Sequence, residues 1–95
     1  MKYTKSIIQD DETCFVCGYG GHTHCHHCIF GNSNRDNSEK YGLKVFLCWE
    51  HHEGNTGVHS NRELDLQIKR IAQQRFEEVH GTRQEFISIF GKSYL

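Results

Sequence analysis

The spacing of apolar residues predicts a long amphipathic helix in the last third of the chain. Apolar positions recur at helical intervals from residue 64 to residue 79, at Leu64, Ile68, Ile71, Ala72, Phe76 and Val79. The run Ser60-Asn61-Arg62-Glu63 in front of them has the sequence of a capping box, and Gly81 behind them provides a stop. At about 1.5 Å per residue, this helix would be on the order of 30 Å long, enough to back the rest of the fold.

A second, shorter helix is predicted close to the C-terminal end. The run Thr82-Arg83-Gln84-Glu85 repeats the capping-box pattern. Apolar side chains at Phe86, Ile87 and Phe90 then follow, and Gly91 is placed to end the helix.

The first half of the chain has the pattern of two strands rather than of helices. A first strand is expected around residues 23–30, and residues 43–47 give a second one with β-branched and aromatic content. Residues 31–42, rich in Gly, Asn and Ser, are predicted to be a loop between them. After Cys48 a short helical turn is expected, which Gly54 and Gly57 should end. The chain is therefore predicted to be α+β, with a two-stranded hairpin followed by two C-terminal helices.

Length and composition place these elements in one domain that spans residues 1–95. It divides into a polar lead-in (1–13), a metal-binding core (14–59) and C-terminal helices (60–95). A chain of this size buries only about 60–70% of its unfolded surface, and much of its 36% hydrophobic content lies in the C-terminal segments. A bound metal would thus help the first half to fold.

Charge and hydropathy restrict the partners and the compartment that we expect. The sequence has no run of 18 apolar residues and no apolar signal region behind Met1, so we expect a soluble protein of the cytoplasm with no membrane partner. The formal net charge of −1 argues against a wide basic footprint on DNA. A bound divalent ion would still supply positive charge where a phosphate must sit.

The five cysteines and eight histidines predict a zinc site rather than disulfides. Cys14 and Cys17 are separated by two residues and followed by a glycine, and Cys48 and His51 repeat the spacing, which completes a Cys3His structural site. Cys25 and Cys28 have the same spacing, so two interpretations stay open. They are strand residues, or they ligate zinc in place of Cys48 and His51.

The adjacent pair His26-His27 is the strongest indication of catalysis. Neighbouring residues on a strand point to opposite faces, so the two imidazoles cannot easily share one ion but can divide two tasks. Phosphodiester hydrolysis needs an activated water and a charge that clamps the scissile phosphate. One histidine can hold a metal while the other activates water.

Longer runs around this pair, on the second strand and in the tail carry a family resemblance. They are His26-His27-Cys28-Ile29-Phe30-Gly31, Asn34-Arg35, Ser38-Glu39-Lys40-Tyr41-Gly42-Leu43-Lys44-Val45, Leu47-Cys48, Val58-His59-Ser60-Asn61-Arg62-Glu63-Leu64-Asp65-Leu66, Arg75-Phe76-Glu77-Glu78 and Ile89-Phe90-Gly91-Lys92. Over roughly residues 14–95, the sequence resembles the HNH endonucleases, also called ββα-metal or His-Me finger enzymes. It is similar in particular to the phage group that includes the Ref-type recombination-enhancement nucleases.

The resemblance implies a DNA endonuclease with a zinc-supported, treble-clef-like ββα-metal core. It implies that His27 is the general base and that His26, His52 and His59 hold one divalent ion, which would be Mg2+, Mn2+, Ni2+ or Zn2+. It further implies a phage or prophage origin in a bacterial host and a role in DNA recombination or processing. Some members act on a recombinase–DNA filament, which is therefore a candidate partner.

Several residues admit a chemical and a structural interpretation. Arg35 and Lys40 could contact phosphates or be solvated loop residues. Trp49 is expected in the core rather than under a nucleobase. The residue that orients the catalytic base in many HNH proteins is an asparagine, and the choice here stays open among Asn32, Asn34 and Asn37. Other polar side chains are expected on solvated faces: His22, His24, Arg62, Lys69 and Arg70.

Two other functions remain to be compared with the nuclease. The first is a treble-clef zinc module that binds nucleic acid or a protein without cutting. Such a module would have no use for an unligated imidazole at His27. The second is thiol redox chemistry at Cys14 and Cys17, which would lack the βαβ context usual for that motif.

Overall fold

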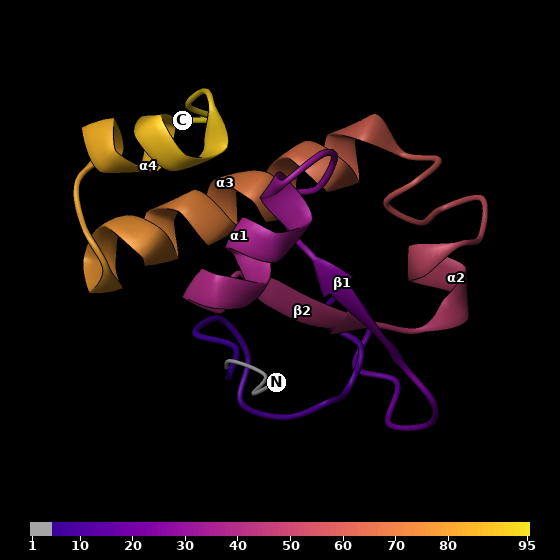
Figure 1. Ribbon diagram of the computed structural model, residues 1–95. Helices are drawn as coiled ribbons and strands as arrows, with labels where there is room; N and C mark the ends of the chain where they lie inside the picture. Colours follow the sequence, from indigo (N-terminus) through magenta and orange to yellow (C-terminus); the bar gives the residue numbers. More distant parts are fainter. Residues whose placement is uncertain (1–4) are drawn as a thin grey trace.

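The computed structural model describes residues 5–95 as an α+β fold, which confirms the predicted fold class. Its elements in chain order are β1 (His24–His27), α1 (Asn34–Tyr41), β2 (Lys44–Leu47), α2 (Trp49–His52), α3 (Arg62–Val79) and α4 (Arg83–Phe90) (Figure 1). The first four residues of the predicted lead-in lie outside the described residues.

The two strands form an antiparallel hairpin at the centre of the molecule (Figure 1). His26 faces Val45 across the hairpin and His24 faces Leu47. The first strand is shorter than predicted, because strand geometry ends at His27, although the amide of Cys28 still donates to the carbonyl of Leu43 at 2.9 Å. The hairpin therefore presents the histidine pair at the end of β1.

The segment 31–42, predicted to be a loop, contains helix α1, so that prediction was wrong. Its polar side chains are fixed by partners far away in the sequence. The side-chain amides of Asn34 and Asn37 donate to the last carbonyls of α4 at 3.1 and 3.3 Å. The hydroxyl of Ser38, which is fully buried, donates to the carbonyl of Ile29 at 2.6 Å. These contacts stabilise a helix in a segment of polar composition. Composition alone does not reveal them.

The C-terminal helices begin and end close to the predicted positions. The N-cap of α3 is Asn61, one residue after the predicted Ser60. The side chain of Asn61 accepts a hydrogen bond from the amide of Leu64 at 3.2 Å. For α4 the capping box of Thr82 and Glu85 is present in full. As predicted, the helix ends at Gly91, where φ is 100°.

The hydrophobic core lies between the hairpin and the C-terminal helices. Fully or almost fully buried side chains come from both halves, among them Ile29, Leu43, Val45, Leu47, Ile68, Ala72, Phe76, Phe86 and Phe90. Trp49 is not part of it, contrary to prediction, because 61% of its surface is exposed. Lys69 also differs from prediction: it is half-buried, pairs with Asp65 at 2.9 Å and lies over the ring of Phe30 at 4.4 Å.

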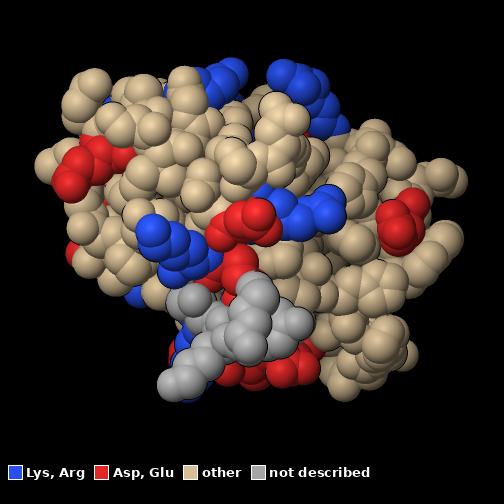
Figure 2. Space-filling model, in the orientation of Figure 1, with Lys and Arg blue, Asp and Glu red and all other residues tan. Residues whose placement is uncertain are grey.

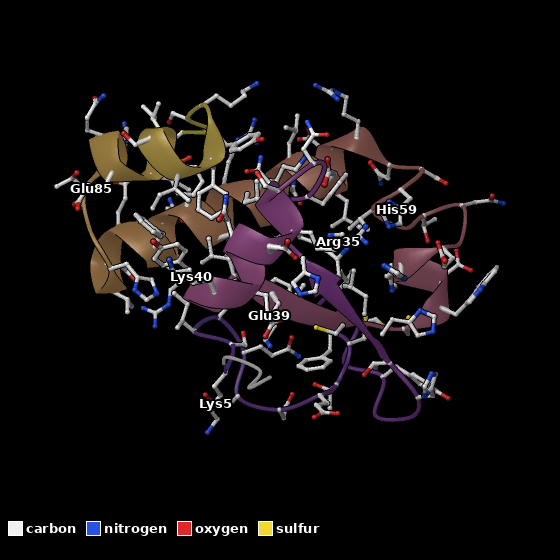
Figure 3. All side chains as sticks on the ribbon, viewed as in Figure 1. Lys5, Arg35, Glu39, Lys40, His59 and Glu85 are labelled. Carbon is white, nitrogen blue, oxygen red and sulfur yellow. The ribbon has the colours of Figure 1, made fainter. Side chains whose placement is uncertain are left out.

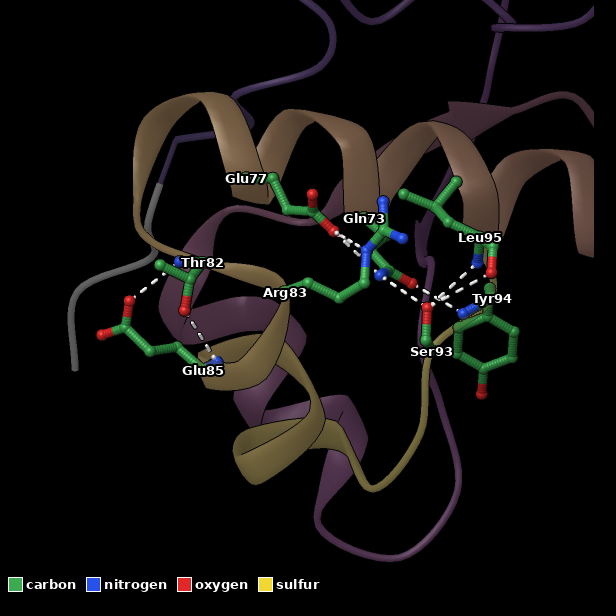
Figure 4. A network of polar contacts seen from close by, with 8 residues as sticks. All are labelled: Gln73, Glu77, Thr82, Arg83, Glu85, Ser93, Tyr94 and Leu95. Carbon is green, nitrogen blue, oxygen red and sulfur yellow. Dashed lines mark hydrogen bonds and ion pairs between the residues drawn. The ribbon is translucent and has the colours of Figure 1, made fainter.

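A buried glutamine fixes the C-terminal tail to α3 (Figure 4). The side-chain nitrogen of Gln73 donates to Glu77 and to the hydroxyl of Ser93, both at 3.0 Å. Its oxygen accepts from the amide of Tyr94 at 2.7 Å. The side chain is completely buried, and these three partners satisfy it.

The N-terminal segment from Ser6 to Phe15 covers the outer edge of β2. The hydroxyl of Ser6 donates to the carbonyl of Lys44 at 2.6 Å, and the amide of Phe46 donates to the side chain of Gln9 at 2.9 Å. The amide of Phe15 donates in turn to the carbonyl of Phe46 at 2.7 Å. The polar lead-in thus protects an edge strand that would otherwise be open to pairing.

Candidate metal centres

Four sulfur and nitrogen donors meet between the N-terminal turn and the start of α2. The ligand atoms of Cys14, Cys17, Cys48 and His51 all lie within 4.8 Å of one another. The Sγ atoms of Cys17 and Cys48 are 3.8 Å apart, and Nδ1 of His51 is 3.3 Å from Sγ of Cys48 and 3.7 Å from Sγ of Cys14. Tetrahedral zinc with bonds of about 2.0–2.3 Å separates its ligands by roughly 3.3–3.8 Å. These four residues could therefore hold a structural zinc ion.

The local backbone prepares this site for thiolates. Gly18, with φ of 80°, donates its amide to the carbonyl of Cys14 at 2.8 Å and closes a tight turn. Burial alone would raise the pKa of the Cys14 thiol. Backbone amides that point at its sulfur, above all those of Cys48 and Cys17, outweigh that effect and lower its pKa to about 6. A low thiol pKa favours the charged form that binds metal.

The two remaining cysteines do not take part in this cluster. Within residues 5–95, Cys25 and Cys28 belong to no group of donors close enough for a shared ion. Cys25 is exposed on β1, whereas Cys28 is completely buried, and burial raises the pKa of its thiol. The structure thus brings Cys14 and Cys17 together with Cys48 and His51, and not with Cys25 and Cys28.

Three histidines form a second cluster beside the hairpin. The ligand atoms of His26, His52 and His59 lie within 4.8 Å of one another, and the Nε2 atoms of His52 and His59 are 3.4 Å apart. Nε2 of His26 is buried and has no hydrogen-bond partner in the part of the chain that the structure describes. Burial, followed by the neighbouring His52 and His59, lowers the pKa of His26 to about 3. A neutral buried imidazole with a vacant nitrogen fits a metal ligand, so this cluster could hold a second metal ion.

The other member of the histidine pair has different partners. Nε2 of His27 is 2.8 Å from Oε1 of Glu39, and Oε2 of the same carboxylate accepts from Nζ of Lys44, also at 2.8 Å. The side chains of Glu39 and Lys44 are only 13% and 8% exposed. His26 and His27, as neighbours on a strand, thus have different contact partners.

One cleft of about 440 Å³ adjoins both histidines of the pair. It is lined by Cys25, His26, His27, Phe30, Arg35, His52, Glu53 and His59. Arg35 lies at the start of α1 on the side toward His59, whereas Lys40 lies at the other end of that helix and does not line the cleft (Figure 3). Lysine, arginine and acidic side chains are interspersed on the face shown in Figure 2.

Two residues of this region were missed by the sequence analysis. Glu39 contacts His27 from α1, the helix that was predicted to be a loop. Two of the three asparagines considered for that position, Asn34 and Asn37, bond to α4 instead. His24 was expected in solvent but is half-buried, with Nδ1 3.1 Å from Nδ1 of His52. The one sequence signal for this contact was the alternation of histidines along the first strand, which places His24 on the same face as His26.

Comparison with protein-family models, with curated proteins and with solved structures finds no match for this chain. In residues 5–95, no helix has both the length and the apolar character that are needed to cross a bilayer. The two donor clusters and the α+β fold are therefore the features from which a function has to be argued.

Proposed function

We propose that this protein is a metal-dependent DNA endonuclease of the HNH type. The proposal rests on one observation, the arrangement of imidazoles in the cleft. The imidazole of His27, which contacts a carboxylate, lies there beside a cluster of three further imidazoles. This arrangement supplies separate groups for proton transfer and for binding a cation, as phosphodiester hydrolysis requires.

His26, His52 and His59 are the residues that would hold one divalent ion. A bound ion would supply a Lewis acid that polarises the scissile phosphate and stabilises the leaving oxygen. All-imidazole ligation favours Mn2+, Ni2+ or Zn2+ over Mg2+, because softer ions prefer nitrogen donors.

His27 is the proposed general base, and Glu39 sets its tautomer. An ionised Glu39 accepts a hydrogen bond from Nε2–H of His27, which leaves the lone pair on Nδ1 to take a proton from water. The same carboxylate stabilises the imidazolium that results. Lys44 donates to the second oxygen of Glu39 and fixes the orientation of the carboxylate. Glu39 thus has the orienting role for which the sequence analysis considered three asparagines.

Arg35 is the proposed phosphate contact. It lines the cleft, and no ion pair is recorded for it within residues 5–95. A guanidinium can bind two phosphate oxygens at once, which would position the backbone of DNA against the histidines. Lys40 is outside the cleft and is a weaker candidate for the same role.

The Cys3His cluster is proposed to bind a structural Zn2+ and to have no part in the reaction. It joins the turn that follows Cys14 to the first residues of α2, the helix that carries His52. The zinc ion would thereby fix the distance between that helix and the hairpin.

The cellular setting of this proposal rests on the family resemblance alone. The substrate would be DNA in a bacterial cell that carries a phage or prophage, and a recombinase–DNA filament is the candidate partner that presents it. Adding such a filament to the cleavage assay tests this extension directly.

A non-catalytic zinc module is the alternative, and one observation favours it. The contacts of His27 with Glu39, and of Glu39 with Lys44, form a half-buried polar network that could have only a structural purpose. On that interpretation, replacing His27 would lower stability, and the protein would bind DNA or a protein partner without cutting it.

Cleavage of supercoiled plasmid and of single-stranded DNA, with Mg2+, Mn2+ or Ni2+ in turn, tests the proposal. The matched variants are His27→Ala and His22→Ala, each with its zinc content measured. We expect metal-dependent cutting that is retained in His22→Ala and lost in His27→Ala, while both variants keep one zinc. DNA binding without cutting by the wild-type protein, with every metal and with a recombinase filament added, would support the non-catalytic module instead.

A further inference from the structure

We infer that His24 is a positioning residue that holds the imidazole of His52 with its Nε2 atom directed at the three-histidine cluster. The inference rests on the proposed function only in taking that cluster as the site of a divalent ion. It concerns a residue that the sequence analysis had placed in solvent.

The distances assign a different neighbour to each nitrogen of His52. Its Nε2 lies 3.4 Å from Nε2 of His59, within the cluster that includes His26. Its Nδ1 lies 3.1 Å from Nδ1 of His24, on the other side of the ring. The rings of His24 and His52 are almost perpendicular, at 86°, with centroids 5.2 Å apart.

These contacts determine where the proton of His52 has to be. A metal ligand needs an unprotonated nitrogen, so ligation through Nε2 requires the single proton of a neutral imidazole to be on Nδ1. Nδ1–H can then donate to Nδ1 of His24, which accepts when its own proton is on Nε2. His24 would therefore fix both the tautomer and the orientation of the ring, as outer partners of ligating histidines commonly do.

The two histidines differ in how firmly the fold holds them. His24 is on β1, opposite Leu47, and shares the face of the strand that carries His26. His52 is the last residue of α2, a helix of four residues, followed by the chain to Gly54. The strand can thus serve as a rigid support for a ligand that comes from a short element without a buried residue.

A separate ion between His24 and His52 is the competing explanation of the short distance. Such a site would need further donors, and outside the three-histidine cluster the imidazole of His22 is a neighbour, with its ring centroid 5.3 Å from that of His24. In the described part of the chain, however, no group of three or more donors close enough for one ion includes His24 or His22. Two nitrogens alone are too few for a protein metal site, so a hydrogen bond explains the contact better.

The test is a titration of protein whose structural site has been filled with Zn2+, using Ni2+ and no DNA. The variants are His24→Ala, His24→Asn and, as the matched control, His22→Ala. Loss of an outer partner of a ligating histidine typically weakens metal binding about 10–100-fold. We therefore expect His24→Ala to raise the Kd for Ni2+ by that factor with an unchanged stoichiometry of one ion, and His22→Ala to bind like the wild type.

His24→Asn separates a hydrogen bond from simple packing. The amide oxygen of asparagine can take the place of Nδ1 and accept from His52, so most of the lost affinity should return. Nitrogen-15 shifts of His52 should report a proton on Nδ1 in the wild type and in His24→Asn, and a mixture of tautomers in His24→Ala. A His24→Ala protein with wild-type Ni2+ affinity would overturn the inference. So would the loss of one bound ion with the affinity for the remaining ion unchanged, because His24 would then be a ligand of a separate site.

The titration also distinguishes failure of this inference from failure of the proposed nuclease. A wild-type protein that binds Ni2+ but never cuts DNA would refute the nuclease, while the effect of His24→Ala on affinity would still stand. A zinc-filled wild-type protein that binds no Ni2+ at all would remove the ion that His24 is inferred to serve, and the inference with it.

Discussion

Replacing Glu39 by glutamine should separate the chemical role of His27 from its structural role. The glutamine amide has nearly the same shape as the carboxylate but only one acceptor oxygen. With Lys44 Nζ at 2.8 Å from Oε2, that oxygen would stay directed at the lysine, and the new NH2 group would face Nε2 of His27. The imidazole must then accept at Nε2 and carry its proton on Nδ1, which removes the lone pair that is proposed to activate water.

The expected effects follow from the geometry of the pair. Opposite charges 2.8 Å apart attract by roughly 6 kcal/mol at an effective dielectric constant of about 20, and desolvation of the buried groups offsets much of this. Breaking such a pair costs about 3–5 kcal/mol, and the retained amide oxygen puts Glu39→Gln at the lower end. We therefore expect a loss of about 3 kcal/mol in the free energy of unfolding. Without a general base, the cleavage rate should fall about 10²–10⁴-fold.

Thermal unfolding and cleavage kinetics measure the two effects, and nitrogen-15 shifts of His27 report its tautomer. Glu63→Gln is the matched control, since Glu63 is exposed in the first turn of α3 and does not line the cleft. The control should keep the wild-type rate. Cleavage by folded Glu39→Gln within about twofold of the control, or a His27 that still carries its proton on Nε2, would refute this account of the base.

Three further predictions concern other parts of the structure. Arg35→Gln should weaken DNA binding most at low salt and reduce the slope of log Kd against log salt concentration by about 0.9, and an unchanged slope would exclude a phosphate contact. With zinc bound, a thiol reagent should label Cys25 first, because Cys25 is exposed, Cys28 is completely buried and the other three thiols would be zinc ligands. Mass spectrometry should find three more labelled thiols soon after the zinc is removed with a chelator. If the reagent labels these three thiols before the chelator is added, the Cys3His assignment is contradicted. Gln73→Leu should cost about 2 kcal/mol, because the amide of Tyr94 loses its partner, and should lower Tm by about 8–16 °C. An unchanged Tm would show that the tail contributes nothing to stability.

The parts of the fold that were predictable from sequence are those fixed by neighbouring residues. Helix α4 is an example, since its capping box and its terminal glycine are all within ten residues. The Cys3His cluster was also foreseen, because ligand spacing follows from the geometry of metal coordination and does not depend on the rest of the fold. The three-histidine cluster was expected only from the resemblance to the HNH endonucleases.

The parts that were missed depend on contacts between distant residues. Helix α1 is polar throughout, and its asparagines bond to carbonyls more than fifty positions away. The link between Glu39 and His27 could not be foreseen without that helix. The contact between His24 and His52 requires knowing that α2 folds back beside β1. Trp49 was misplaced for a related reason, since hydrophobicity predicts average burial and not the side of a short helix that faces solvent.

Helix α2 carries neighbouring histidines that belong to different centres: His51 to the Cys3His cluster and His52 to the three-histidine cluster. Because the helix has only four residues, His51 cannot leave its cluster without moving His52 as well. If each cluster binds an ion, an ion at one centre would therefore favour the geometry of the other, and the metal affinities of the two centres should be coupled in both directions. Removal of zinc from the Cys3His cluster should then weaken the affinity of the three-histidine cluster for its own ion, although zinc in the first site would do no chemistry.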